Sequence, residues 1–324
     1  MAKPTLLQMG PMMPLIDDGI AKHFEVHRLH EAENRSQLIQ KISGEVVALC
    51  TGGHTGVKCD AGFQAQFPRL RIIGNFGVGY DSIDAKAAAK RGIIVTNTPD
   101  VLTEEVADTA LGLLLMTVRE LGKAESYLRE GLWATSGDYP LTAGSLRDRI
   151  VGLVGMGRIG QAIAKRVAAF DVPVVYFSRT ARKELPYRHY AKLTEMARDV
   201  DTLIVITPGG PETANLINRE VLEELGPRGI LINIARGSVV DETALIEALK
   251  TNTIMAAGLD VFWNEPKINP EFMSLPNAVL LPHVGSASEH TREQMGQLVV
   301  DNLAAFAEGK PPPTPVAETP FKGW

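Results

Sequence analysis

Short apolar runs alternate with amphipathic stretches over the first hundred residues, and polar or turn-forming residues bound each run. This pattern predicts strands that alternate with helices. We expect strands at Thr5–Gln8, Glu25–His30, Val46–Cys50, Ile72–Asn75 and Ile94–Thr96. Such alternation is typical of an open, mostly parallel sheet that helices cover on both faces.

A longer apolar-rich stretch with helical spacing begins at Thr103 and continues to about Arg129. Glu104 and Glu105 suit its first turn, because carboxylates are favourable at the positive end of a helix dipole. We therefore predict one long helix there. The segment before it, which ends at Pro99, breaks the alternation, and we place the first domain boundary at that point.

The alternation resumes near residue 150 and continues almost to the end of the chain. The predicted strands are Ile150–Val154, Val174–Phe177, Thr202–Ile206, Gly229–Asn233, Met255–Leu259 and Val279–Leu281. A final helix is predicted at Ser288–Glu308, and the proline-rich tail Pro311–Pro320 should lie extended on the surface. A chain of 324 residues with this pattern favours two α/β domains.

A glycine motif follows the strand Ile150–Val154. It reads Gly155-x-Gly157-x-x-Gly160, and an amphipathic stretch comes directly after it. In such motifs the first glycine permits a tight turn, the second lets backbone amides approach a pyrophosphate, and the third lets the helix lie close to the strand. The anion then binds at the helix N-terminus. An ordinary glycine-rich turn is the alternative, but the flanking strand and helix favour dinucleotide binding.

Composition narrows the possible partners and the compartment. The chain has 33 Lys and Arg against 38 Asp and Glu, and its basic residues are dispersed, which argues against nucleic acid as a partner. It has two cysteines, Cys50 and Cys59, which favours a reducing, cytoplasmic environment without disulfides. We predict no signal peptide or membrane span, since prolines and acidic residues interrupt the N-terminal apolar positions.

Histidines raise the question of a metal site. His23, His27 and His30 are close in sequence, but a strand there would scatter their side chains, so we predict no metal. His54 lies in a glycine-rich loop after a predicted strand. Loops at that end of a parallel sheet line the ligand crevice, yet a solvated turn histidine is an equal alternative.

Three further charged residues stand at the ends of predicted strands: Arg236, Glu265 and His283. An arginine at the carboxyl end of a strand points into the crevice, where its planar fork suits a carboxylate. The alternative for Arg236 is a surface ion pair with Asp241 or Glu242. Each of the three alone would more often be structural.

Together these segments resemble one family, the D-isomer-specific 2-hydroxyacid dehydrogenases. The resemblance extends from the loop Gly77-Val78-Gly79-x-Asp81 through residues 96–108 and the glycine motif to His283. It implies two doubly wound parallel-sheet domains. A flavodoxin-like substrate domain would comprise residues 1–99 and 288–324, and a Rossmann cofactor domain would comprise residues 100–287. In the family the substrate lies in the cleft between the domains, and the cofactor is NAD or NADP.

The resemblance also assigns roles to the three charged residues. His283 would donate a proton to the carbonyl oxygen while a nicotinamide delivers hydride to C2, Glu265 would fix the imidazole and favour its protonated form, and Arg236 would bind the substrate. The implied substrate-binding residues are Val78, Gly79, Arg236, Ser286, His54, Tyr80 and Trp133. The implied cofactor-binding residues are Gly155, Gly157, Arg158, Ile159, Gly160, Ser178, Arg179, Thr180, Thr207, Pro208, Thr213, Ile234, Ala235, Arg236, Asp260, His283 and Gly285.

The end of the second Rossmann strand departs from the commonest family pattern. An acidic residue there would bind the ribose 2′-hydroxyl, but this chain has Ser178-Arg179-Thr180. We therefore expect NADPH to be preferred over NADH, unless Arg179 merely faces water. In this trait the chain is most similar to the NADPH-linked glyoxylate/hydroxypyruvate reductases and the hydroxyphenylpyruvate reductases.

The expected activity is reduction of small 2-oxo acids such as glyoxylate and hydroxypyruvate to D-2-hydroxy acids. Reduction of hydroxyphenylpyruvate or phenylpyruvate is the alternative. Formate dehydrogenases are disfavoured because they have glutamine in place of Glu265, and long phosphoglycerate dehydrogenases because they carry an extra regulatory domain. A non-enzymatic, dinucleotide-sensing corepressor of the same fold is a further alternative, since fold alone does not fix function.

The stretch Tyr127–Ser145 is too long for a tight connection between a helix and a strand. Trp133 within it either packs on its own long helix or docks on a second subunit. Related reductases dimerise through this region and place a matching tryptophan at the partner's substrate site. We therefore predict a two-fold homodimer in which Trp133 shapes the neighbouring pocket.

Overall fold

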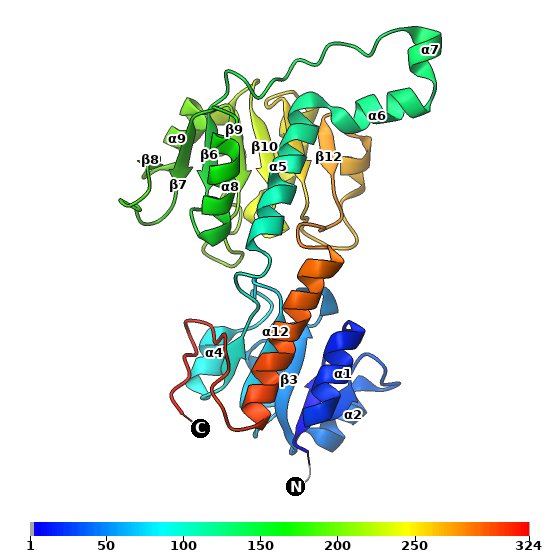
Figure 1. Cartoon of the computed structure of the whole chain (residues 1–324), viewed down its shortest axis with the longest axis vertical. Coiled ribbons are helices and arrows are strands. Elements are labelled where there is room, and N and C mark those ends of the chain that lie inside the picture. Colours follow the sequence, from blue (N-terminus) through cyan, green and yellow to red (C-terminus); the bar gives the residue numbers. More distant parts are fainter. Residues whose placement is uncertain (1–2, 324) are drawn as a thin grey trace. The chain divides into compact units, whose positions relative to one another are not determined.

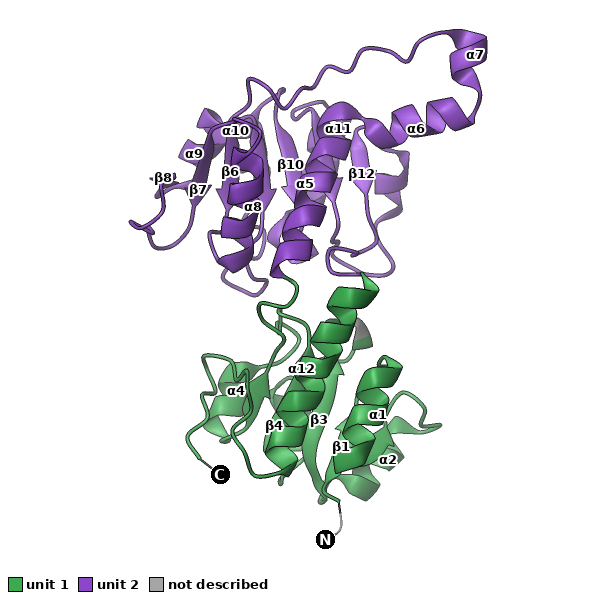
Figure 2. Cartoon of the chain, in the orientation of Figure 1, with its two compact units in different colours: residues 1–102, 288–324 green, residues 103–287 purple. Residues whose placement is uncertain are grey.

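The computed structural model describes residues 3–323, with the side chain of His54 excepted. The chain divides into two compact units, one of residues 1–102 and 288–324 and one of residues 103–287 (Figure 2). The first division therefore falls after Leu102, close to the boundary placed at Pro99. Within residues 3–323, no helix is long and apolar enough to cross a membrane.

Unit 1 is built on a five-stranded parallel sheet in the flavodoxin-like order β2-β1-β3-β4-β5 (Figure 1). Its strands are β1 (Thr5–Gln8), β2 (Glu25–Arg28), β3 (Val46–Gly52), β4 (Ile72–Phe76) and β5 (Ile94–Thr96). Its helices are α1 (Pro14–His23), α2 (Arg35–Ile42), η1 (Gly53–Thr55), α3 (Ala61–Ala65), α4 (Ala85–Lys90) and α12 (Glu289–Ala307). All five predicted strands are present.

Helices cover both faces of this sheet. Ile16 of α1 and Leu303 of α12 are fully buried in one cluster with Ile72 of β4, while α2, α3 and α4 contribute to a second cluster. The tail after α12 runs beside the edge strand β5, because Val316 N–H donates to Val95 O at 2.9 Å and Pro315 pairs antiparallel with Thr96. The C-terminal segment thereby covers the hydrogen-bonding edge of β5.

Unit 2 is built on a seven-stranded parallel sheet in the order β12-β11-β10-β9-β6-β7-β8 (Figure 1). Its strands are β6 (Val151–Val154), β7 (Val174–Phe177), β8 (Arg188–Tyr190), β9 (Thr202–Val205), β10 (Ile230–Asn233), β11 (Ala256–Leu259) and β12 (Ala278–Leu280). Its helices are α5 (Thr103–Arg119), α6 (Leu121–Arg129), α7 (Leu132–Ser136), α8 (Arg158–Ala168), α9 (Leu193–Asp199), α10 (Arg219–Leu225), η2 (Gly237–Val239), α11 (Glu242–Lys250) and η3 (Pro270–Ser274).

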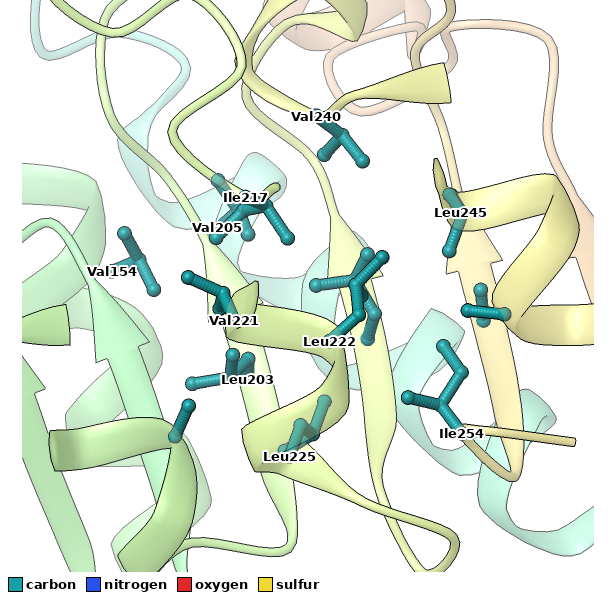
Figure 3. Packing of buried hydrophobic residues seen from close by; sticks show 14 of the residues in the cluster. Val154, Leu203, Val205, Ile217, Val221, Leu222, Leu225, Val240, Leu245 and Ile254 are labelled. Carbon is teal, nitrogen blue, oxygen red and sulfur yellow. The ribbon is translucent and has the colours of Figure 1, made fainter. Parts of the chain in front are cut away.

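Aliphatic side chains fill the space between this sheet and its helices. Val154 and Leu203 of the central strands are 0% exposed and belong to one cluster with Val221 of α10 and Leu245 of α11 (Figure 3). Helices α9, α10 and α11 cover this face, and α5 and α8 pack together over the other. The two-domain doubly wound fold predicted from the sequence is confirmed.

One prediction about local structure was wrong, and one short strand was not predicted. The single helix predicted from Thr103 to Arg129 is two helices, because Glu120 adopts a left-handed conformation with φ 52° between α5 and α6. The short edge strand β8 was not predicted, since it has three residues and two of them are polar or charged.

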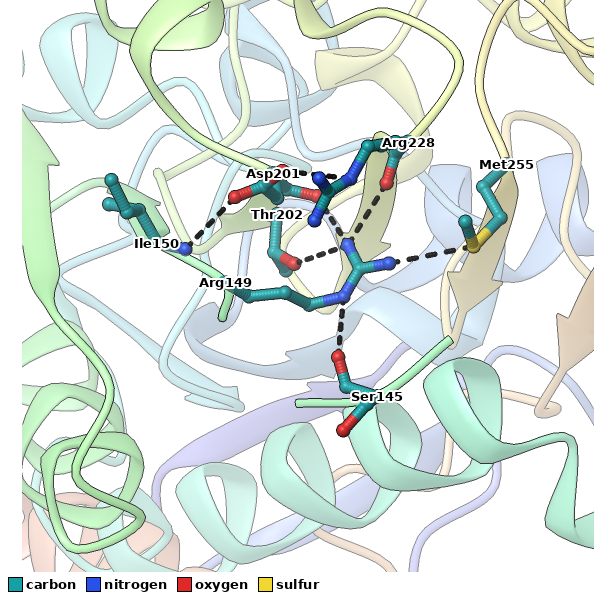
Figure 4. Close-up of polar contacts among 7 residues, drawn as sticks. All are labelled: Ser145, Arg149, Ile150, Asp201, Thr202, Arg228 and Met255. Atoms are coloured by element: carbon teal, nitrogen blue, oxygen red, sulfur yellow. Dashed lines mark hydrogen bonds and ion pairs between the residues drawn. The ribbon is translucent and has the colours of Figure 1, made fainter. Parts of the chain in front are cut away.

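A buried arginine joins several strands at the amino edge of the sheet in unit 2. Arg149 is 3% exposed, and its guanidinium donates to Ser145 O at 2.8 Å, Asp201 O at 2.9 Å and Arg228 O at 3.0 Å (Figure 4). Two longer contacts of 3.5 Å reach Thr202 Oγ1 and Met255 Sδ. These acceptors precede or begin different elements, so one side chain satisfies carbonyl groups that would otherwise be buried without donors.

Candidate functional site

The glycine motif forms the turn between β6 and α8. Gly155 has φ 113°, and a Cβ atom at Gly160 would lie 2.4 Å from Gly155 O, so both positions require glycine. Gly157 is the N-cap residue of α8, and no atom lies within 4 Å of where its Cβ would be. The N-terminus of an eleven-residue helix thus faces open space, which suits the phosphate of a dinucleotide.

Other residues of unit 2 also fit a dinucleotide. Arg158 and Ile159 open α8, and Ile234 and Ala235 follow β10 at the same carboxyl edge of the sheet. After β9, Thr207 Oγ1 is buried and has no hydrogen-bond partner within the described residues. An orphaned hydroxyl there can donate to or accept from a bound ligand.

The loops after β7 and β9 meet through an ion pair. Arg179 Nη1 lies 2.7 Å from Glu212 Oε2, and both side chains are largely exposed. Next to them, Ser178 Oγ donates to Thr180 O, and Thr213 Oγ1 donates to Pro208 O. Arg179 is thus an exposed side chain paired with a carboxylate, and a 2′-phosphate would have to compete with Glu212 for it.

His283 and Glu265 form a hydrogen-bonded pair in unit 2. His283 Nδ1 lies 2.6 Å from Glu265 Oε2, and Glu265 Oε1 accepts from the Phe262 N–H at 2.8 Å. Burial alone would raise the pKa of Glu265. The hydrogen bonds from His283 and Phe262, together with the charges of His283 and Arg236, outweigh burial and lower that pKa. The carboxylate is thus ionised at neutral pH and orients the imidazole.

A buried carboxylate shapes the loop that carries His283. Asp260 is 1% exposed, and its two oxygens accept from the N–H groups of Val284 and Gly285 at 2.7 and 2.9 Å. Burial raises the pKa of Asp260, although these two hydrogen bonds favour its ionised form. His283 itself has φ 54°, an uncommon conformation that this loop maintains.

Arg236 follows β10 and lies near the same pair of residues. Its Nη1 donates to Ala235 O at 2.7 Å, and the buried Asn233 side chain donates to Arg236 O at 3.0 Å. A Cβ atom at Gly237 would lie 1.9 Å from the Phe262 carbonyl carbon, so the glycine lets the loops after β10 and β11 touch. The charge of Arg236 contributes to lowering the pKa of Glu265, although the two residues are far apart in sequence.

The remaining predicted substrate residues are placed in both units. In unit 1, Val78, Gly79 and Tyr80 follow β4, and Tyr80 Oη donates to Glu318 Oε2 at 3.0 Å. Burial and this contact raise the pKa of Tyr80 to about 12. The backbone of His54 lies in the turn η1, but its side chain is outside the described residues. In unit 2, Ser286 follows His283 in the same loop and is half-buried.

Trp133 lies on a projecting segment of unit 2. Helices α6 and α7 have no buried residues, and Figure 1 shows that they extend away from the sheet together with the chain that follows them. Trp133 is 61% exposed, and Leu128 and Leu141 are exposed as well. The Trp133 indole N–H donates to Asp138 Oδ1 at 3.1 Å within the same segment.

Comparisons with known proteins identify the family. Residues 111–285 match the NAD binding domain model of the D-isomer specific 2-hydroxyacid dehydrogenases. A hydroxyphenylpyruvate reductase of Plectranthus scutellarioides and a glyoxylate/hydroxypyruvate reductase of Arabidopsis thaliana are each 41% identical over 311 residues, 96% of this chain and 98% of theirs. An NADPH-dependent glyoxylate/hydroxypyruvate reductase of Sinorhizobium meliloti, solved with NADP and malonate, is 49% identical with a TM-score of 0.93, covering 99% of this chain and 98% of that one.

The chain therefore belongs to the D-isomer-specific 2-hydroxyacid dehydrogenase family. It is an oxidoreductase with an NAD(P)-binding Rossmann domain. The predicted family and enzyme class are confirmed, and the non-enzymatic corepressor alternative finds no support among the relatives named here.

The sequence did not point to residues whose side chains contact other segments of the chain. Glu212 was not connected with Arg179, and the amide side chains of Asn75 and Asn97 were not singled out. The one available signal was a polar residue at the carboxyl end of an otherwise apolar strand. It could indicate an unusual environment but not the partner.

Proposed function

We propose that this enzyme reduces small 2-oxo acids, glyoxylate and hydroxypyruvate first among them, to D-2-hydroxy acids with NADPH. The observation that carries the proposal is the 2.6 Å contact between His283 and Glu265, next to Arg236 at one edge of the sheet in unit 2. The names of relatives that cover nearly the whole chain support the substrate class. Aromatic 2-oxo acids are the second candidate, supported by the hydroxyphenylpyruvate reductase relative.

In the proposed reaction the protein supplies a proton and holds the substrate. His283 Nδ1 is engaged by Glu265, so the proton for the carbonyl oxygen comes from Nε2. The Arg236 guanidinium binds the substrate and stabilises the negative charge that develops on the oxygen. When bound, the nicotinamide would supply the hydride that reduces C2. The residues that would hold it are those at the glycine motif and at the carboxyl ends of β7, β9 and β10.

A kinetic panel tests the substrate class. We expect glyoxylate and hydroxypyruvate to give higher kcat/KM than pyruvate or phenylpyruvate when each is tested with NADPH and with NADH. The absence of turnover with all four acids would refute the proposed function. A clear preference for phenylpyruvate would instead favour the aromatic alternative.

Arg179 is proposed to determine the preference for NADPH over NADH. Arg179→Ala is expected to lower the ratio of kcat/KM for NADPH over NADH by about tenfold or more, because a charge-assisted contact to the 2′-phosphate is lost. Glu212→Gln is expected to raise the same ratio, since Glu212 competes with the phosphate for Arg179.

The control for this pair is Arg219→Ala, which breaks an exposed arginine–glutamate pair with Glu247 outside the proposed phosphate site. That variant should leave the cofactor ratio unchanged. If Arg179→Ala also leaves it unchanged, Arg179 does not recognise the phosphate.

The projecting segment α6–α7 supports a homodimer as the working assembly. Its exposed Leu128 and Trp133, together with Leu141 in the chain that follows, form apolar surface that a second copy of the chain would bury. Light scattering is expected to report twice the chain mass, and Trp133→Ala should shift the preference among 2-oxo acids. A monomer at micromolar concentration that retains full activity would contradict this assembly.

A further inference from the structure

Two asparagine side chains hold the turn that follows β4 in unit 1. Asn75 lies in β4 and is 1% exposed, and its Nδ2 donates to Gly77 O at 2.9 Å and Gly79 O at 3.0 Å. Asn97 follows β5, and its Nδ2 donates to Val78 O at 2.9 Å. All three carbonyl groups of the turn are therefore held by side-chain amides, and Gly77 O also accepts from the Thr98 N–H at 3.1 Å.

Fixing these carbonyl groups also orients the N–H groups of the turn. In a trans peptide the C=O and the following N–H point in opposite directions, so the N–H of Val78 points away from Asn75 and the N–H of Gly79 points away from Asn97. Gly77 has φ 147°, which a residue with a side chain would rarely adopt. Neither N–H donates a hydrogen bond to a described residue. Consecutive N–H groups of this kind bind anions.

The side-chain oxygen of Asn75 lacks a hydrogen bond within the described part of the chain because its amide nitrogen is directed at the turn. Its Oδ1 is buried and has no hydrogen-bond partner among residues 3–323, so half of the amide is unsatisfied. Both hydrogen bonds from its Nδ2 go to the turn. An apolar side chain would avoid the unsatisfied oxygen but could not hold the two carbonyl groups.

Asn97 is in turn held by the C-terminal tail. Thr314 Oγ1 donates to Asn97 O at 2.6 Å, and Asn97 N–H donates to Thr314 O at 3.3 Å. Thr314 is itself bonded to Asn302 of α12, whose Nδ2 donates to its Oγ1 at 2.8 Å. Elements from both ends of the unit 1 sequence thus fix the position of the asparagine that holds Val78.

We propose that Asn75 and Asn97 are positioning residues that present the N–H groups of Val78 and Gly79 to the carboxylate of the substrate. The identity of that carboxylate as a 2-oxo acid rests on the proposed function. The arrangement itself rests on the hydrogen bonds within unit 1.

Asn75→Asp is the decisive variant, because it keeps the size of the side chain and replaces the donor by an acceptor that faces two carbonyl groups. We expect KM for glyoxylate and the inhibition constant of malonate to rise about tenfold or more, with a much smaller change in kcat. The dissociation constant for NADPH should not change. Asn97→Ser, at a half-buried site, removes one hydrogen bond and should produce the same changes to a smaller extent.

Gln64→Glu is the matched control. Gln64 is 0% exposed, its Nε2 donates to Cys59 O at 2.9 Å and Asp84 O at 3.0 Å, and its Oε1 is also buried without a described partner. Like Asn75→Asp, this variant replaces a buried amide donor that serves two carbonyl groups by an acceptor, but it does so away from the turn. It should lower the melting temperature as Asn75→Asp does, without raising KM or the malonate inhibition constant.

Equal effects of Asn75→Asp and Gln64→Glu on malonate inhibition would overturn the proposal. If Asn75→Asp does not fold, an unchanged malonate constant in Asn97→Ser overturns it. Calorimetric binding of malonate to the NADPH-loaded protein separates this inference from the proposed function, since it requires no turnover. A wild-type protein that binds malonate but reduces no 2-oxo acid would refute the function, while loss of that binding in Asn75→Asp would still support the positioning role.

Discussion

Replacing His283 by asparagine is expected to lower kcat for 2-oxo acid reduction by about 100-fold or more, because the proposed general acid is removed. Asparagine is the better replacement than alanine, since it tolerates the φ of 54° that His283 adopts. The dissociation constant for NADPH should stay close to the wild-type value. Steady-state kinetics and cofactor titration by fluorescence measure the two quantities.

The matched control is His290→Ala. His290 is an exposed histidine on α12 whose Nε2 contacts Gln294, and its loss should not change kcat. If His283→Asn turns over like the wild type, His283 has no part in the chemistry.

Glu265→Gln tests the same pair through its pH dependence. Interaction with His283 helps to lower the pKa of Glu265, and the variant replaces this carboxylate by a neutral amide. In the proposed reaction His283 donates a proton and Glu265 supports its positive charge, so the variant should lose activity at the higher end of the pH profile first, and its falling limb should move to lower pH. A profile that coincides with the wild type would show that Glu265 does not support the charge on His283.

Arg149→Met is expected to cause the largest loss of stability. It leaves the carbonyl groups of Ser145, Asp201 and Arg228 buried without this donor, and breaking such a buried network costs about 3–5 kcal/mol. Burial lowers the pKa of Arg149. The melting temperature should fall by about 6 °C or more.

Arg198→Met provides the comparison. Arg198 makes two contacts of 2.7 Å with Glu224, shorter than any contact of Arg149, but its side chain is 64% exposed. Because solvent screens the exposed ion pair, its loss should hardly change the melting temperature. If the two variants melt alike, burial does not decide the contribution of Arg149.

The sequence predicted most strands because their apolar runs are short and bounded by turn residues, as at Ile72–Phe76. It could not predict the break at Glu120, since neither glycine nor proline occupies that position and the reversal depends on the left-handed conformation of one residue. The short strand β8 depends on pairing with β7 rather than on its own pattern. Local patterns fail where tertiary contacts decide the structure.

The charged residues of the candidate site could likewise be predicted from the sequence, but the residues that support them could not. Residue type and position at strand ends were enough to propose Arg236, Glu265 and His283, and the structure places His283 and Glu265 in contact. Their supports could not be inferred, because Asp260 holds backbone groups 24 and 25 residues away. A contact of that kind exists only after the sheet has formed.

The position of α12 in the chain affects how the molecule is synthesised. The strands that α12 covers end at Thr96, but the helix itself begins at Glu289. At typical rates of translation the ribosome needs roughly 10 to 40 seconds to make the intervening chain. During that time Ile72 and Ile94 lack the cover that Val299 and Leu303 later provide, so the nascent sheet exposes apolar surface of the kind that chaperones bind. Unit 2, which is encoded in one continuous stretch, can therefore complete its fold before unit 1, where synthesis began.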